Sequence, residues 1–166
     1  MATYQLISSV TVGSGGAATM TFSSIPATYT DLLLKISSRN TSGGADNHRI
    51  SFNGNTTSYS FRSLEGNGST ASSINASTRI IGVINGSSST ASTFSNNEIY
   101  IPNYTSSNFK SFSADAVSEN NATTAYAQLW ANLWSNTAAI TSIDIDANTL
   151  TFAQYTTAYL YGISNA

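Results

Sequence analysis

Few residues of this chain have side chains that could do acid–base or metal chemistry. The only histidine is His48, in the run Asp46-Asn47-His48-Arg49. A hydrolytic site needs a base that a second group orients, and a metal site needs several ligands. A single histidine beside a strand is ordinarily a surface or hydrogen-bonding residue, so we expect no catalytic role for His48.

The carboxylates Asp144 and Asp146 are the other candidates for chemistry. A carboxylate pair can bind Ca²⁺ or hydrolyse a glycosidic bond. These two alternate with Ile143 and Ile145, and such alternation is typical of an amphipathic strand with one solvated face. We therefore assign both carboxylates to a strand surface.

Nucleotide and thiolate sites have no better support. Gly66-Asn67-Gly68-Ser69-Thr70-Ala71 formally matches a dinucleotide fingerprint, but that motif works only where a strand turns into a helix, and the serines and threonine here start a helix poorly. The chain has no Cys, so it forms neither a thiolate metal site nor a disulfide. We expect no catalytic residue, no cofactor, no metal, and no enzymatic activity.

The composition points to strands and to assembly. Charged residues make up 8% of the chain, against about 25% in an ordinary globular protein. Polarity comes instead from 29 Ser, 22 Thr and 17 Asn, which favour strands and turns over helices. Aromatic residues reach 11%, too many for a disordered chain. The net charge of −2 leaves little repulsion between copies, which suits an assembly component.

Charge and hydropathy also exclude two classes of partner. Six Lys and Arg against eight Asp and Glu give no basic surface for phosphates, so we expect no nucleic-acid partner. No segment approaches the ~20 apolar residues of a membrane span. Residues 1–6 lack the basic residues and apolar run of a signal peptide. We expect that the protein is made in a cytoplasm and that it does not associate with a membrane.

Apolar and polar residues alternate between Gly, Asn and Ser clusters along the whole chain, as in many short antiparallel strands. The predicted strands lie at 18–23, 31–37, 50–52, 59–64, 79–84, 98–101, 110–117, 143–146 and 158–163. The tetrapeptide Ser-Thr-Ala-Ser at 69–72 and at 89–92 indicates low-complexity loops. So many strands predict an all-β fold, a single-domain antiparallel β-sandwich over residues 1–166, jelly-roll-like.

The segment 122–134 fits two structures. From Tyr126, the residues Leu129, Trp130, Leu133 and Trp134 recur at helical spacing, and the same stretch also alternates as a strand would. Because the surrounding chain is β throughout, we favour the strand.

As a strand, this segment should turn its small side chains and leucines inward, where they suit a closely packed sheet interface. That face carries Ala127, Leu129, Ala131 and Leu133. The opposite face then becomes a candidate subunit interface or glycan-stacking surface, because rings bury area while amides supply hydrogen bonds. Its residues are Tyr126, Gln128, Trp130, Asn132 and Trp134. The reverse assignment, with the aromatic side in the core, stays open.

Four blocks of the sequence resemble a module of the structural proteins of tailed bacteriophages, especially aquatic ones. The blocks are IPATYTDL (25–32), residues 47–53 with YSFR (59–62), IYIPNY (99–104) and LWSNTAAITSI (133–143). The resemblance covers nearly the whole chain. It implies no catalytic residues, and the module occurs both alone and within longer tail or fibre proteins.

The resemblance implies a virion protein, with two roles open. The chain begins close to its first recognisable strand and ends with its last, so we expect a stand-alone capsid decoration or cement protein on the outer surface of the phage head, made in the host cytoplasm. Its partners would be the major capsid protein or other virion proteins. The alternative is a receptor- or glycan-binding tail or fibre module that meets a host surface glycan.

Self-association is also expected. Native sheets guard exposed edges with Lys, Pro or closure, and this chain offers only Lys35, Lys110, Pro26 and Pro102. Its edges should therefore be closed or covered by neighbours. We expect a homo-oligomer, most plausibly a homotrimer because the threefold positions of a capsid invite one.

Overall fold

The computed structural model describes residues 2–121 and 125–164. Within these ranges the chain forms twelve strands and no helix, and hence no helix that could cross a membrane. In chain order the strands are β1 (Thr3–Thr11), β2 (Thr19–Phe22), β3 (Asp31–Ser38), β4 (Asp46–Phe52), β5 (Tyr59–Gly66), β6 (Ala71–Ala76), β7 (Ile80–Ile84), β8 (Ser95–Ile101), β9 (Lys110–Val117), β10 (Ala127–Trp134), β11 (Ile143–Asp146) and β12 (Thr157–Ser164).

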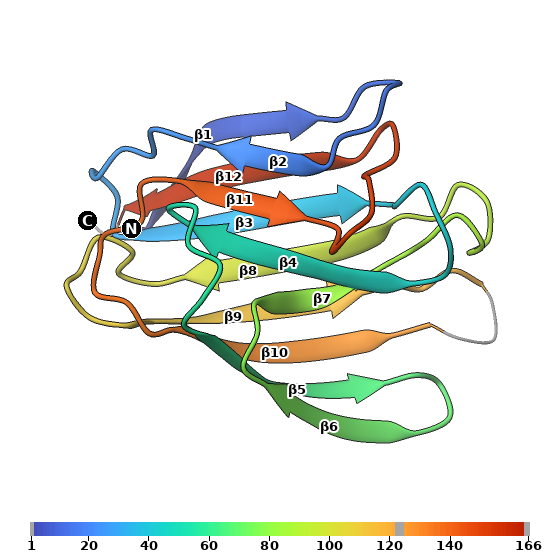
Figure 1. Ribbon diagram of the computed structural model, residues 1–166. Coiled ribbons are helices and arrows are strands. Elements are labelled where there is room, and N and C mark those ends of the chain that lie inside the picture. The colour runs from blue at the N-terminus through green and yellow to red at the C-terminus, as the bar shows by residue number, and fades with distance from the viewer. Residues whose placement is uncertain (1, 122–124, 165–166) are drawn as a thin grey trace.

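The strands form two sheets that pack face to face (Figure 1). The large sheet has eight strands in the order β1-β12-β3-β8-β9-β10-β5-β6, and the small sheet has four in the order β2-β11-β4-β7. Every pair of neighbouring strands is antiparallel. The predicted all-β antiparallel sandwich is confirmed, whereas these strand orders do not establish the jelly-roll arrangement.

The core lies between the sheets because alternate residues of each strand point inward. Strand β9 alternates buried and exposed residues along its whole length, as period-2 patterning requires. Its Phe112 meets Phe52 of β4 edge to face at 5.3 Å between ring centroids, and Phe52 meets Trp134 of β10 in the same way at 5.4 Å. We call the side of the large sheet that faces the small sheet its inner face and the other side its outer face.

The ambiguous segment is a strand, which confirms that prediction for 127–134; residues 122–124 lie outside the described part. The predicted face assignment is wrong, because Trp130 and Trp134 point inward and Leu129 is 53% exposed. Trp130 packs on Phe61 at 4.7 Å between ring centroids. Two indole rings bury more apolar area than alanines and leucines do, so the aromatic side takes the core.

The sequence prediction missed β1 and β6, the two edge strands of the large sheet. Most residues of β1 are exposed on both faces, and five of the six residues of β6 are exposed. A strand without a buried face carries no apolar alternation, which is why the pattern gave no signal. The loop predicted for 69–72 is wrong from Ala71 onward, since β6 begins there.

Candidate functional site

His48, the only histidine, is buried in the core and stacks on Phe152 at 6.0 Å between ring centroids. Its Nε2 lies 2.6 Å from the hydroxyl of Ser38. Burial lowers the pKa of His48 to about 3, with Asp146 opposing the shift weakly. The ring is therefore neutral at pH 7 and has no access to a substrate, so it supports the fold and not acid–base chemistry.

The carboxylates Asp144 and Asp146 lie on strand β11, on the face of the small sheet turned away from the core. Asp144 accepts a hydrogen bond from Thr21 at 2.7 Å. Asp146 pairs with two guanidinium groups, at 2.7 Å from Arg49 Nε and 2.6 Å from Arg79 Nη1. These contacts tie β11 to its neighbour β4 and to the residue before β7, so the role of Asp146 is structural. Among the residues that the structure describes, no group of three His, Cys, Asp or Glu could hold a metal ion.

The five residues predicted as an interface or glycan face do not form an exposed surface. Gln128, Trp130, Asn132 and Trp134 are all buried, and only Tyr126 is half-buried. The prediction that this face is turned outward is wrong for the four buried residues, for the reason given above. The structure nevertheless brings three of the five, Tyr126, Gln128 and Trp130, together in the lining of one groove.

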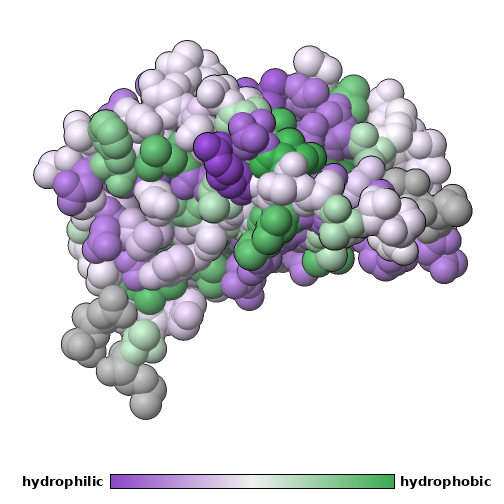
Figure 2. Space-filling model, turned by 90° about the horizontal axis from the view of Figure 1, so that it is seen from below, coloured by the Kyte–Doolittle hydropathy of each residue, from purple (hydrophilic) through white to green (hydrophobic). Residues whose placement is uncertain are grey.

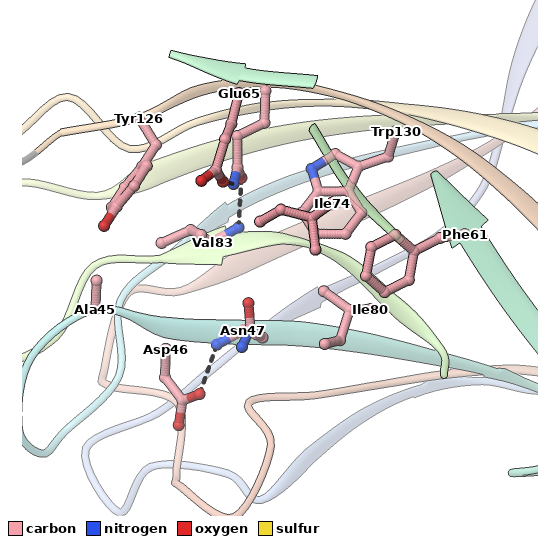
Figure 3. Close-up of a pocket in the computed structure, with 11 residues that line it drawn as sticks. Ala45, Asp46, Asn47, Phe61, Glu65, Ile74, Ile80, Val83, Tyr126 and Trp130 are labelled. Atoms are coloured by element: carbon pink, nitrogen blue, oxygen red, sulfur yellow. Dashed lines mark hydrogen bonds between the residues drawn. The ribbon is translucent and has the colours of Figure 1, made fainter. Parts of the chain in front are cut away.

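This groove, which we call the β7 groove, opens where β5 and β6 extend beyond the edge of the small sheet. It encloses about 330 Å³. Its lining residues are Ala45, Asp46, Asn47, Phe61, Glu65, Ile74, Ile80, Val83, Tyr126, Gln128 and Trp130. Figure 3 shows Tyr126, Glu65 and Trp130 on one side of the groove and Asp46, Asn47 and Ile80 on the other.

A chain of hydrogen bonds crosses the β7 groove from one sheet to the other. Glu65 accepts from the Ser72 hydroxyl at 3.0 Å and from Gln128 Nε2 at 2.9 Å. Gln128 Oε1 in turn accepts from the backbone N–H of Val83 at 3.0 Å. The network holds β6, β5, β10 and β7 in fixed relation, so the groove is built in advance of any ligand.

The polar groups of the groove define what it could bind. Asp46 and Glu65 are carboxylates, and the lining contains no Lys or Arg among the residues that the structure describes. The indole Nε1 of Trp130 is buried and has no hydrogen-bond partner among the described residues. Figure 3 shows this nitrogen on the edge of the ring that faces Glu65. A neutral or cationic ligand with a hydrogen-bond acceptor fits this set of groups, whereas an acidic ligand does not.

Sequence reasoning found Tyr126, Gln128 and Trp130 but missed Glu65, Phe61 and Ile74. These three lie on β5 and β6, and only sheet register brings them near β10. Gln128 of β10 pairs with Glu65 of β5, and Ser63 of β5 pairs with Ile74 of β6. The amphipathic pattern of 59–64 places Phe61 on the same face as Tyr59, but no local signal pairs either residue with β10.

The outer face of the large sheet is the second candidate surface. Seven large apolar side chains on this face are between 39% and 63% exposed: Tyr4, Leu6, Leu64, Tyr100, Val117, Leu129 and Tyr159. The ion pair between Lys35 and Glu98, at 2.8 Å, lies among them. Figure 2 sees both sheets edge-on, from the end formed by β5 and β6, and at this end hydrophobic residues gather between hydrophilic ones. Exposed apolar side chains on one sheet face are typical of a surface that meets another protein.

No protein-family model matches this chain, and no curated protein sequence matches it.

Proposed function

We propose that this protein is a non-catalytic structural component of a virus particle, carried on the outside of the phage head as a decoration or cement protein. The observation that carries the proposal is the outer face of the large sheet, on which seven exposed apolar side chains are spread over one broad sheet surface. The resemblance of the sequence to phage structural modules agrees with it.

The outer face suits attachment to a protein shell. Its charges are few, and Lys35 and Glu98 neutralise each other. Asp115 and Arg62 are also exposed on this face, beside the strand of Leu129. A neighbouring protein that covers them must supply opposite charges or leave them at the rim, because an unpaired buried charge would cost several kcal/mol. Leu64 and Leu129 stand on neighbouring strands and face each other in register, so they form an apolar centre for the contact.

The residues able to do chemistry are used for structure, which supports a non-catalytic role. His48 is a buried neutral ring. Asp146 is paired with two arginines. Neither side chain is free to act on a substrate.

The test is binding to assembled heads that lack the protein, measured by co-sedimentation. Leu129→Asp places a charge in the apolar pair of Leu129 and Leu64, beside Asp115, and we expect it to weaken binding at least tenfold. Tyr155→Asp is the matched control, because Tyr155 is 69% exposed but lies in the loop before β12. Equal binding by wild type and both variants would overturn the role of this face.

Labelled microscopy of intact particles locates the protein directly. Gold-labelled antibodies should decorate the head evenly. Label found only at the tail would overturn the decoration role and favour the second candidate function.

The second candidate, a receptor- or glycan-binding tail module, is favoured by the β7 groove. The groove combines apolar side chains such as Ile74 with the carboxylates Asp46 and Glu65, which can accept hydrogen bonds from sugar hydroxyls. The Trp130 Nε1 donor without a partner can serve an acetamide or hydroxyl oxygen. The absence of a cationic residue from the lining favours neutral sugars over uronic acids.

Nuclear magnetic resonance tests this second candidate with an internal control. The chain has two Trp, so the indole region of a proton–nitrogen spectrum holds two signals. Titration with N,N′-diacetylchitobiose should shift the signal of Trp130 and leave that of Trp134, which lies deep in the core and outside the groove. Glucuronic acid should shift neither. No shift with chitobiose or with a panel of other neutral disaccharides would overturn the glycan reading.

A further inference from the structure

Strand β6 is an open edge of the large sheet. It pairs only with β5, in an unbroken register from Phe61 opposite Ala76 to Gly66 opposite Ala71. Its sequence, ASSINA, contains no charge and no Pro. Figure 1 shows β6 at the outer edge of the large sheet. The backbone N–H and C=O groups on the free side of an edge strand have no ladder partner, which makes the strand a template for pairing with another chain.

The other edge of the large sheet, β1, is protected in two ways. Its register with β12 shifts between Leu6 and Ser8. Such a bulge bends and twists an edge and so prevents regular pairing. Strand β1 also packs against β2 of the small sheet.

The two edges of the small sheet are protected as well. Strand β7 has its backbone groups satisfied by side chains of the large sheet: Gln128 accepts from the N–H of Val83, and Asn97 donates to the carbonyl of Ile81 at 3.2 Å. Strand β2 has only four residues, and short edge strands pair poorly.

The side chains that usually guard an edge are placed elsewhere. Lys35 lies on β3 and Lys110 on β9, both inside the large sheet. Pro26 lies between β2 and β3, and Pro102 directly after β8. Among the four sheet edges of the described residues, β6 alone is regular, of ordinary length and without any such protection.

We propose that two copies of this chain pair through β6, antiparallel and related by a twofold axis, so that their large sheets become one continuous sheet. This inference goes beyond the proposed function, and it names a strand for the self-association expected from the sequence. It stands on the geometry of the edge and needs no virus shell.

Sheet geometry restricts how the two copies meet. Directly opposite residues of an antiparallel pair lie on the same face. On β6 the inward residues are Ser72, Ile74 and Ala76, because the last two oppose the buried Ser63 and Phe61 of β5. A twofold axis perpendicular to the sheet must therefore place a residue opposite itself, and Ile74 or Ser73 lies nearest the middle of the strand.

Ile74 and the absence of charge favour a second copy as the partner. Ile74 is 41% exposed although it lies on the inner face, because the small sheet ends at β7 and does not cover it. Pairing about Ile74 would place two isoleucines side by side, and the partner strand would cover both. An edge without charge neither repels an identical edge nor selects an oppositely charged one.

The twofold pairing gives a unit of two copies. A homotrimer, the number expected from the sequence, would need a further contact, because an isologous contact uses the same patch on both partners and is closed once formed.

The absence of Cys from the chain gives a clean test by cross-linking. Opposite residues in an antiparallel pair have Cα atoms about 4.5 to 5.5 Å apart, within the range that a disulfide spans. Ser73→Cys and Ile74→Cys, made one at a time, should convert most of the purified protein into a disulfide-linked dimer under mild oxidation. The register decides which of the two reacts faster. Both positions are exposed, so circular dichroism should show both variants folded.

The control variant is Ser9→Cys, at an exposed position of the protected edge β1. It should stay monomeric at the same protein concentration. Ser73→Lys is the complementary variant, and it should raise the dimer dissociation constant measured by sedimentation at least tenfold. Cross-linking through Ser9→Cys alone would overturn the choice of edge. A monomer without cross-linking at 73 or 74 would overturn the pairing itself, and either result leaves the shell-binding proposal to its own experiment.

Discussion

The side-chain Oε1 of Gln128 accepts a hydrogen bond from the backbone N–H of Val83 at 3.0 Å, and this contact joins the large sheet to the free edge of the small one. Gln128 also donates to Glu65 at 2.9 Å. Because Gln128 is only 7% exposed, water does not readily replace these hydrogen bonds. The contact protects an edge and closes the floor of the β7 groove.

Gln128→Leu should destabilise the protein by about 1 to 3 kcal/mol, because it removes the acceptor of the Val83 N–H and leaves Glu65 with only the hydrogen bond from Ser72 described above. Urea unfolding measures the change. Asn96→Leu, at an exposed position of β8, is the control and should stay within about 0.5 kcal/mol of wild type. An equal effect of both variants would mean that the buried amide contributes nothing specific.

Trp130→Ala should cost about 3 to 5 kcal/mol, because it empties a large volume of core beside Phe61. Leu129→Ala, the next residue on the same strand, should cost about 1 kcal/mol or less because its side chain is 53% exposed. Thermal or urea unfolding of the two variants checks which face of β10 is the core. Comparable losses would contradict the observed orientation of the strand.

Strands with one buried face could be predicted from the sequence, and strands without one could not. Phe112, Ala114 and Ala116 alternate with polar residues and mark β9 correctly. Strand β6 offers no such contrast, since the residues from Ala71 to Asn75 are exposed on both faces. The edge strand that carries the proposed pairing is thus the one that local patterning is least able to find.

The sequence could not predict which face of β10 points into the core, for a different reason. Both of its faces alternate equally well, so the choice depends on neighbours that only the fold supplies. Trp130 packs against the ring of Phe61 on β5, and Trp134 packs against Phe52 of the opposite sheet. The β7 groove depends on the same long-range register, which explains why Glu65 and Ile74 were not predicted.

Asp146→Asn should destabilise the protein by roughly 1 to 3 kcal/mol, because Arg49 and Arg79 lose their shared, largely buried carboxylate. Asp144→Asn is the matched control on the same strand. Asp144 accepts one hydrogen bond, from Thr21, at an exposed position, and an amide oxygen can still accept it, so the cost should stay below about 0.5 kcal/mol. Urea unfolding at pH 7 compares them, and equal costs would contradict a special role of Asp146.

The buried ring of His48 should make stability depend on pH. Burial lowers its pKa in the folded protein from 6.5 to about 3. Between these two values the unfolded chain binds a proton that the folded chain does not, so acid favours unfolding. The stabilising effect is complete above the unfolded pKa and is lost progressively as the pH falls toward the folded one.

From pH 7 to pH 5 this single group should lower the free energy of unfolding by about 2 kcal/mol, since each unit in this window is worth at most about 1.4 kcal/mol. Urea unfolding at pH 5, 6, 7 and 8 measures the slope. His48→Gln can keep a hydrogen bond to Ser38, which lies 2.6 Å from the histidine Nε2, but takes up no proton. It should be less stable than wild type at pH 7 and should lose about 2 kcal/mol less than wild type on acidification to pH 5. Parallel pH curves for the two proteins would show that His48 is not the titrating group.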